Sequence, residues 1–200
     1  PYELLKNVKI WLLDSYCKSN SFQNESLFKP FCVKFCEQAF AANLEAQKGL
    51  GIVSMMFEEK NAYASIGYAL YSLTSYVFSE NPIKYKTKIK GESEKQDKMI
   101  VDFWCAEKDF KFEAYIESKK LWLNIGNVKW EFGKSCNILI KKAFEQIKRL
   151  KSAGVDKKSS KYTEGAVFKI VLFQIPIVYH PKFKPEDTDL ESAPKHLENL

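Results

Sequence analysis

The sequence has few histidines and no glycine-rich phosphate loop. Its two histidines, His180 and His196, lie at or beyond the end of the last predicted strand. A zinc site or a nucleophile activated by histidine is therefore not expected. The eight glycines match neither common phosphate-loop pattern, which argues against nucleotide hydrolysis and a dinucleotide cofactor.

The cysteines do not fit a disulfide framework, because they are odd in number and irregularly spaced. Among the five, Cys32 and Cys36 are one helical turn apart, but no further Cys/His pair completes a zinc set. We interpret the cysteines as small buried residues of a protein in the reducing cytoplasm. No signal peptide is visible, and a start at Pro1 without Met allows for a missing or trimmed N-terminal piece.

One uncharged run is long enough to cross a bilayer, but its composition argues against a membrane span. Residues 61–79 are 19 positions without a charge, yet they include four Ser and four Tyr. Their apolar residues also recur with helical spacing, which favours a buried amphipathic helix and predicts no membrane partner.

The overall composition is that of a globular protein, with 46% hydrophobic and 28% charged residues. We predict one domain over residues 1–180, with a helical part at 1–80 and a core sheet and helix at 81–180. Residues 181–200 are predicted to be a loose polar tail. The net charge of +6 is compatible with a polyanionic partner, but it is also common in lysine-rich proteins that bind none.

Hydrophobic periodicity predicts two helices, three strands, a helix and a final strand. The order indicates an α/β or α+β fold with a mixed sheet, in which a meander is followed by a crossover helix. Asn81-Pro82 is expected to end the second helix, Ser135 to cap the third, and Pro176 to bend or stop the last strand. Residues 121–134 fit either a strand extension or a loop. The predicted helices are 27–48, 55–78 and 136–152, and the predicted strands are 83–90, 98–105, 110–120 and 166–178.

Three charged residues on the second and third predicted strands suggest a reactive site. Glu117 and Lys119 lie on the same face of the third strand, about 7 Å apart. Asp102 is the single charge within residues 99–106, where a carboxylate is costly unless Lys119 or a metal ion pairs with it. Asp102 and Glu117, with the carbonyl of Ser118, could hold a divalent cation. Lys119 would orient the attacking water or offset charge on a phosphate.

These residues resemble the PD-(D/E)xK nuclease superfamily, which has the restriction-endonuclease-like fold. The resemblance covers about residues 55–178 and includes the order of elements. It implies that Asp102 and Glu117 bind Mg²⁺ or Mn²⁺ and that Lys119 is the catalytic lysine. It also implies a supporting Glu from the preceding helix, Glu59 or else Glu58.

The helix after the motif extends this resemblance through Gln146, which matches a glutamine that some members carry there. Two positions depart from the family pattern. In the family a proline precedes the aspartate, whereas Val101 occupies that position here. Some branches carry a tyrosine four residues after the glutamine, whereas this chain has Leu150. The (D/E)xK pattern occurs four times in the chain, but only Glu117-Ser118-Lys119 lies in the middle of a predicted strand.

The leading expectation is metal-dependent hydrolysis of nucleic acid by a DNA endonuclease of restriction or defence type. A homodimer would suit cutting of both strands. The alternative is a catalytically inactive module of the same fold that binds nucleic acid or protein.

Structural explanations remain open for each charged group. Asp102 could simply pair with a lysine, and Glu117 and Lys119 could form the solvated face of an edge strand. The lysines at 84, 86, 88 and 90 fit a phosphate-binding face or the protection of an exposed edge equally well. A solvated helix face explains most of the basic cluster of residues 141–161.

Overall fold

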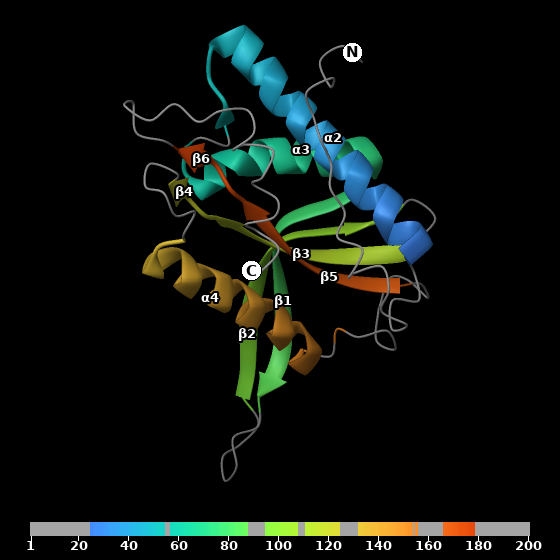
Figure 1. The fold of residues 1–200 in the computed structure, drawn as a ribbon. Coiled ribbons are helices and arrows are strands. Elements are labelled where there is room, and N and C mark those ends of the chain that lie inside the picture. The colour runs from blue at the N-terminus through green and yellow to red at the C-terminus, as the bar shows by residue number, and fades with distance from the viewer. Residues whose placement is uncertain are drawn as a thin grey trace.

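A four-stranded mixed sheet with helices on both faces forms the core of the protein (Figure 1). The computed structural model describes residues 25–54, 57–87, 95–107, 111–124, 132–153, 155 and 166–178. The helices are α2 (Glu25–Leu50), the 3-10 helix η3 (Glu59–Ala62), α3 (Tyr63–Leu73) and α4 (Lys134–Ser152). The strands are β1 (Tyr76–Thr87), β2 (Lys95–Ala106), β3 (Phe112–Lys120), β4 (Leu123–Asn124), β5 (Ala166–Gln174) and β6 (Ile177–Val178).

The strand order β1-β2-β3-β5 confirms the predicted mixed sheet. β1, β2 and β3 form an antiparallel meander, and α4 then carries the chain across so that β5 pairs parallel to β3. Leu123 and Asn124 of β4 pair with β6 in a separate two-stranded parallel sheet, which the sequence interpretation did not include.

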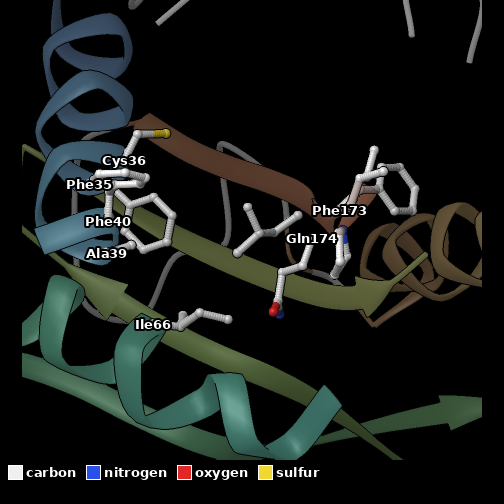
Figure 2. Close-up of a pocket in the computed structure, with 10 residues that line it drawn as sticks. Phe35, Cys36, Ala39, Phe40, Ile66, Phe173 and Gln174 are labelled. Atoms are coloured by element: carbon white, nitrogen blue, oxygen red, sulfur yellow. The ribbon is translucent and has the colours of Figure 1, made fainter. Parts of the chain in front are cut away.

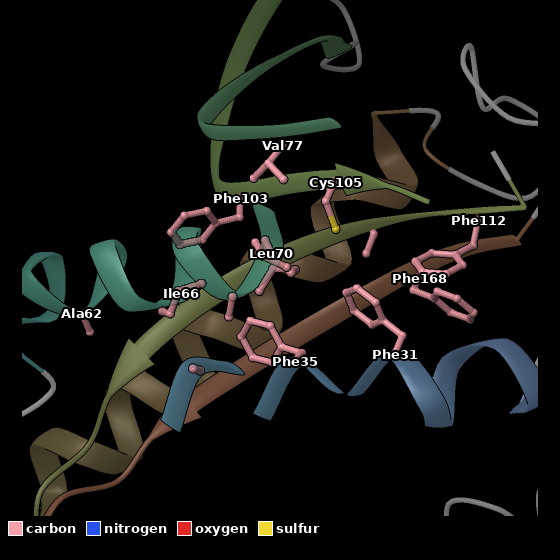
Figure 3. Packing of buried hydrophobic residues seen from close by; sticks show 14 of the residues in the cluster. Phe31, Phe35, Ala62, Ile66, Leu70, Val77, Phe103, Cys105, Phe112 and Phe168 are labelled. Carbon is pink, nitrogen blue, oxygen red and sulfur yellow. The ribbon is translucent and has the colours of Figure 1, made fainter. Parts of the chain in front are cut away.

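One face of the sheet packs against α2 and α3 through a cluster rich in phenylalanine (Figure 3). The Phe31 ring of α2 meets the Phe112 ring of β3 edge-on, with centroids 5.0 Å apart. Phe112 in turn lies 5.2 Å from Phe168 of β5. Alternate strand residues point to this layer, so burial of their apolar surface fixes the register of the strands.

The other face of the sheet packs against α4. Ile147 and Leu150 of this helix contact a cluster that includes Val101, Trp104 and Tyr115. The two apolar layers occupy opposite sides of the strands, which explains why β3 is buried along almost its whole length. The interpretation of Glu117 and Lys119 as the solvated face of an edge strand is therefore wrong, because β3 lies between β2 and β5.

The second predicted helix is too long at its C-terminal end. α3 stops at Leu73, and Thr74 adopts extended φ and ψ angles of −150° and 150°. Val77 is buried between exposed Tyr76 and Phe78, which is the alternation of a strand. The error arose because Val77 also follows Leu73 at helical spacing, so one apolar residue satisfied both periods.

Thr74 holds this change from helix to strand in place. Its buried hydroxyl donates to the carbonyl of Ala106 in β2 and accepts the N–H of Tyr76 at 3.2 Å. These two hydrogen bonds connect the start of β1 to the end of β2. Pairing between the two strands therefore decides the backbone conformation here, against the local helix propensity.

Asn81-Pro82 does not end a helix, which is a second correction. Both residues lie within β1, where Pro82 is the register partner of Ile100. A proline fits here because β1 is an edge strand of this sheet and can leave the proline nitrogen without a ladder hydrogen bond. Glu80 just before them has a positive φ of 48°.

The second predicted helix also starts too early, because α3 begins only at Tyr63, after the 3-10 helix Glu59–Ala62. Most other element ends differ from prediction by a few residues. α2 extends to Leu50, and Gly51 follows with a φ of 68° that favours glycine. α4 begins at Lys134 with Gly133 at its N-cap, so Ser135 is not the cap. β5 ends at Gln174, shortly before Pro176, as predicted. Within the described residues, no helix combines the length and apolar character needed to cross a membrane.

Several predictions lie outside the described residues. They concern Cys17, both histidines, the tail at 181–200 and the loop lysines at 157, 158 and 161. Lys88 and Lys90 also lie outside, whereas Lys84 is exposed on the edge strand β1.

Replacing Thr74 by Val should destabilise the protein by about 1–3 kcal/mol, because valine keeps the shape but removes both hydrogen bonds of the buried hydroxyl. Thr74→Ser keeps the hydroxyl and is the matched control. Equilibrium unfolding in urea would measure both. Equal stability of Thr74→Val and the wild type would contradict the role assigned to this side chain.

Candidate active site

The pairing of β2 with β3 gives way at Asp102. The ladder joins Phe103–Ala106 to Glu113–Ile116, and beyond it the Asp102 carboxylate reaches across to β3. Its Oδ2 accepts the backbone N–H of Ser118 at 2.7 Å, and its Oδ1 accepts the Tyr63 hydroxyl at 2.5 Å. Two hydrogen bonds to the charged form explain how an apolar strand accommodates this aspartate.

The Lys119 ammonium lies among three carboxylates. Its Nζ is 2.8 Å from Oε1 of Glu117, 3.1 Å from Oε1 of Glu59 and 3.7 Å from Oδ2 of Asp102. It also donates to the carbonyl of Ser118 at 2.8 Å. The predicted group from the second and third strands is therefore brought together around a single cationic nitrogen.

Glu59 reaches this cluster from η3, ahead of α3. In addition to contacting Lys119, its Oε2 accepts the backbone N–H of Lys120 at 3.4 Å. Glu58, the alternative that the sequence left open, is exposed. Of the two adjacent glutamates, Glu59 is the one that contacts the lysine.

Gln146 of α4 contacts the oxygen of Glu117 that does not face Lys119. Its Nε2 donates to Oε2 of Glu117 at 2.6 Å and to the carbonyl of Ile100 in β2 at 2.9 Å. The side chain thus spans β2 and β3 beyond the point where their ladder ends. Gln146, which the resemblance singled out on this helix, thus contacts Glu117 and leaves Oε1 of Glu117 directed at Lys119.

Two residues that sequence reasoning did not assign to the site support it. Tyr63, the first residue of α3, donates its hydroxyl to Asp102 as described above. Gln174 at the end of β5 donates through Nε2 to Oγ of Ser118 at 2.8 Å, and this amide is buried. A polar residue directly after the apolar run Ile170–Phe173 was the available signal for Gln174.

Gln174 also borders an apolar pocket between α2 and the end of β5 (Figure 2). This pocket has a volume of about 320 Å³, and none of its lining side chains carries a charge. Phe35 and Phe40 of α2 contribute aromatic rings to its wall. The pocket therefore lacks the charged groups of the site formed around Lys119.

The electrostatics of the cluster oppose full ionisation of Glu117. Its side chain is 1% exposed, and burial raises its pKa to about 7, with Asp102 and Glu59 adding to the rise and Lys119 opposing it. Burial lowers the pKa of Lys119, but the three carboxylates outweigh this effect and the net pKa is raised. Lys119 is therefore protonated at neutral pH.

Glu113 is separate from this group, although it lies on the same strand face. It is fully buried, and its Oε2 accepts the indole N–H of Trp104 at 3.2 Å. Oε1 of Glu113 makes no hydrogen bond within the described part of the chain. Its contacts are with the α4-side core, away from Lys119.

The chemistry of the donors suits a hard divalent cation. Carboxylate oxygens of Asp102 and Glu117 and the carbonyl of Ser118 already surround one cation, the Lys119 ammonium. Oxygen ligands of this kind are those that Mg²⁺ prefers, and Mg²⁺ commonly retains several waters. Among the described residues, no set of three His, Cys, Asp or Glu side chains is arranged as a ready metal site.

Comparisons with known proteins found no matching family model, no matching curated protein and no matching solved structure.

Glu117→Gln should change how stability depends on pH in metal-free protein. The raised pKa means that the unfolded chain ionises at this position near pH 4.5, whereas the folded protein does so near pH 7. The contribution of Glu117 to stability is therefore fully present below about pH 4.5 and lost as the pH rises through 7. The variant should gain stability relative to the wild type across this interval, with no further gain above it.

Chemical denaturation between pH 4 and 8 in the presence of a chelator would measure this difference. Glu145→Gln replaces an exposed carboxylate on α4 and serves as the control. A constant difference between Glu117→Gln and the wild type at all these pH values would contradict the raised pKa.

Proposed function

We propose that this protein is a metal-dependent nuclease that hydrolyses phosphodiester bonds of nucleic acid, with DNA as the expected substrate. One observation carries the proposal: side chains from η3, β2, β3 and α4 converge on the Lys119 ammonium and on Glu117. Bringing three carboxylates together from separate segments costs free energy, because their mutual repulsion must be offset. A site for a cation and a phosphate explains this arrangement.

Asp102, Glu117 and the Ser118 carbonyl would hold the cation, Mg²⁺ or Mn²⁺. Glu59 would be an additional ligand on the same side of the site. When bound, the ion polarises the phosphodiester and lowers the pKa of a coordinated water. The other side chains of the site orient the groups that would hold this ion. Tyr63 and the Ser118 N–H orient Asp102, while Gln146 orients Glu117.

Lys119 acts in this scheme as a hydrogen-bond donor. In the metal-free protein the three carboxylates raise its pKa, so the side chain is a charged ammonium at neutral pH. With the cation bound by the carboxylates, the ammonium is free to donate to the attacking water or to a phosphate oxygen. There it would offset the negative charge that develops during hydrolysis.

Exposed basic residues on α4 support a polyanionic substrate. The helix that supplies Gln146 also carries Lys141, Lys142, Lys148 and Arg149, all exposed. Positive side chains next to the site would attract a phosphate backbone and make binding depend on salt. A DNA endonuclease with a restriction or defence role, acting as a homodimer on both strands, is the most specific form of this proposal.

A catalytically inactive binding module is the second candidate, and one observation favours it. Lys119 already contacts all three carboxylates, so the group is electrostatically compensated without a metal ion. Such a network can serve structure alone. The two candidates differ in whether the protein cuts nucleic acid when a divalent cation is supplied.

The nuclease proposal predicts cleavage of plasmid or single-stranded DNA with Mg²⁺ or Mn²⁺ and none with chelator. Lys119→Met should reduce the rate by about 100-fold or more, because removing one group that stabilises transition-state charge has effects of this size. Lys48→Ala, in the exposed last turn of α2, is the control for general loss of charge. Cleavage that survives in Lys119→Met would overturn the site, and binding without cleavage would favour the inactive module.

Mg²⁺ should raise the melting temperature of the wild type, because a ligand of the folded state stabilises it. Glu117→Gln should lose most of this increase, since an uncharged amide binds Mg²⁺ poorly. Lys119→Met should retain or enlarge it, because its side chain no longer competes for the carboxylates. Differential scanning fluorimetry with a Mg²⁺ titration would show this, and equal shifts in all three proteins would exclude a metal site at Glu117.

A further inference from the structure

A second pocket begins where β3 ends, directly beside the candidate active site. It has a volume of about 650 Å³, and Glu59 lines it as well as contacting Lys119. Its other lining side chains include Phe57, Lys120, Trp122 and Leu139. The shared glutamate places this pocket next to the group that would hold the metal and the phosphate.

Lys120 has an unusual environment in this pocket. The residue is 6% exposed, and its Nζ makes no hydrogen bond within the described residues. Its contact is with the ring of Trp122, whose centroid lies 4.4 Å from Nζ. A buried ammonium has three donors to satisfy, so a cation–π contact alone leaves a cost that a hydrogen-bond acceptor in the pocket would remove.

The pocket also exposes aromatic surface. Trp122 is 42% exposed and Phe57 is 49% exposed, although both are large apolar side chains. Aromatic rings that line an open pocket next to a phosphate site offer stacking surfaces for nucleobases. The same rings would bind any flat apolar group, so the polar side chains decide which group fits.

The balance of charge favours a base over a phosphate. Two carboxylates, those of Glu58 and Glu59, line the pocket together with the amine of Lys120, and Glu59 is also paired with Lys119. The pocket therefore offers a phosphate no excess of positive charge. A nucleobase is neutral, and its edge carries acceptors for Lys120 and donors for the carboxylates, while Asn61 in the same wall can do both.

We infer that this pocket binds an unpaired nucleobase of the substrate strand, stacked on Trp122 and hydrogen-bonded by Lys120. The inference deepens the proposed nuclease function and rests on it for the identity of the ligand. A base that stacks in this pocket cannot remain in a regular duplex. The substrate is therefore single-stranded nucleic acid, or a duplex opened next to the cleaved bond.

Binding in EDTA tests the pocket without cleavage. The probes are a fluorescent twelve-residue thymidine oligonucleotide, an abasic oligonucleotide of the same length and charge, and a hairpin duplex. Fluorescence anisotropy would give the affinity of the wild type, Trp122→Ala, Trp122→Phe and Lys120→Met. Phe144→Ala removes an exposed aromatic on α4 outside this pocket and is the matched control.

Trp122→Ala should weaken binding of the thymidine oligonucleotide by roughly 5- to 150-fold, which is the contribution of stacking one base on an aromatic side chain. Trp122→Phe should restore most of the loss. Lys120→Met should weaken the same complex several-fold without lowering the melting temperature, because it removes an unpaired buried charge. Affinity for the abasic and duplex probes should be unchanged in every variant.

Two results would overturn the proposal of a base-binding pocket. One is equal affinity of all variants for the thymidine oligonucleotide. The other is that the variants lose as much affinity for the abasic probe as for the thymidine oligonucleotide. The nuclease proposal is decided separately, by cleavage with Mg²⁺. If the protein cleaves DNA but Trp122→Ala does not weaken binding, the base-binding pocket is rejected and the nuclease proposal stands. If Trp122→Ala weakens binding of the thymidine oligonucleotide but the protein does not cleave DNA, the nuclease proposal is rejected and the base-binding site stands.

Discussion

The hydrogen bond from the Ser118 N–H to the Asp102 carboxylate is the interaction on which the arrangement of the site depends. It takes the place of ladder pairing between β2 and β3, and the strands diverge there. Gln146 can then reach both Ile100 and Glu117 from the α4 face. Without this divergence, continuous pairing would leave no room between the two strands for side chains from both helical layers.

Charge compensation is the second constraint, and it follows from the first. Divergent strands and packed helices bury Glu117 beside Asp102 and Glu59, where like charges raise the free energy of the ionised state. Lys119 offsets this repulsion and is itself kept protonated. Stability in the absence of a ligand and the proposed binding of a cation therefore involve the same four side chains, because any added cation would have to compete with one ammonium.

The main elements could be predicted because their apolar spacing is regular, and the crossover from β3 through α4 to β5 follows from their order. The predictions failed where one residue satisfied two periods or where a neighbouring strand decided the outcome. Val77 fits both a helix and a strand, and pairing with Cys105 selects the strand. Pro82 signals a break in isolation, but an edge position tolerates it. Tyr63 and Gln174 were missed because their partners are distant in sequence.

The sequence by itself determined much of the composition of the candidate site: local periodicity placed one isolated aspartate and a Glu-Ser-Lys motif on neighbouring strands, and the resemblance added a glutamine on the following helix. Tertiary structure decided which of these residues meet. It selected Glu59 over Glu58, separated Glu113 from Glu117, and placed β3 in the centre of the sheet rather than at its edge. The physical reason is that backbone periodicity fixes the face to which a side chain points, whereas packing of distant segments fixes what it contacts there.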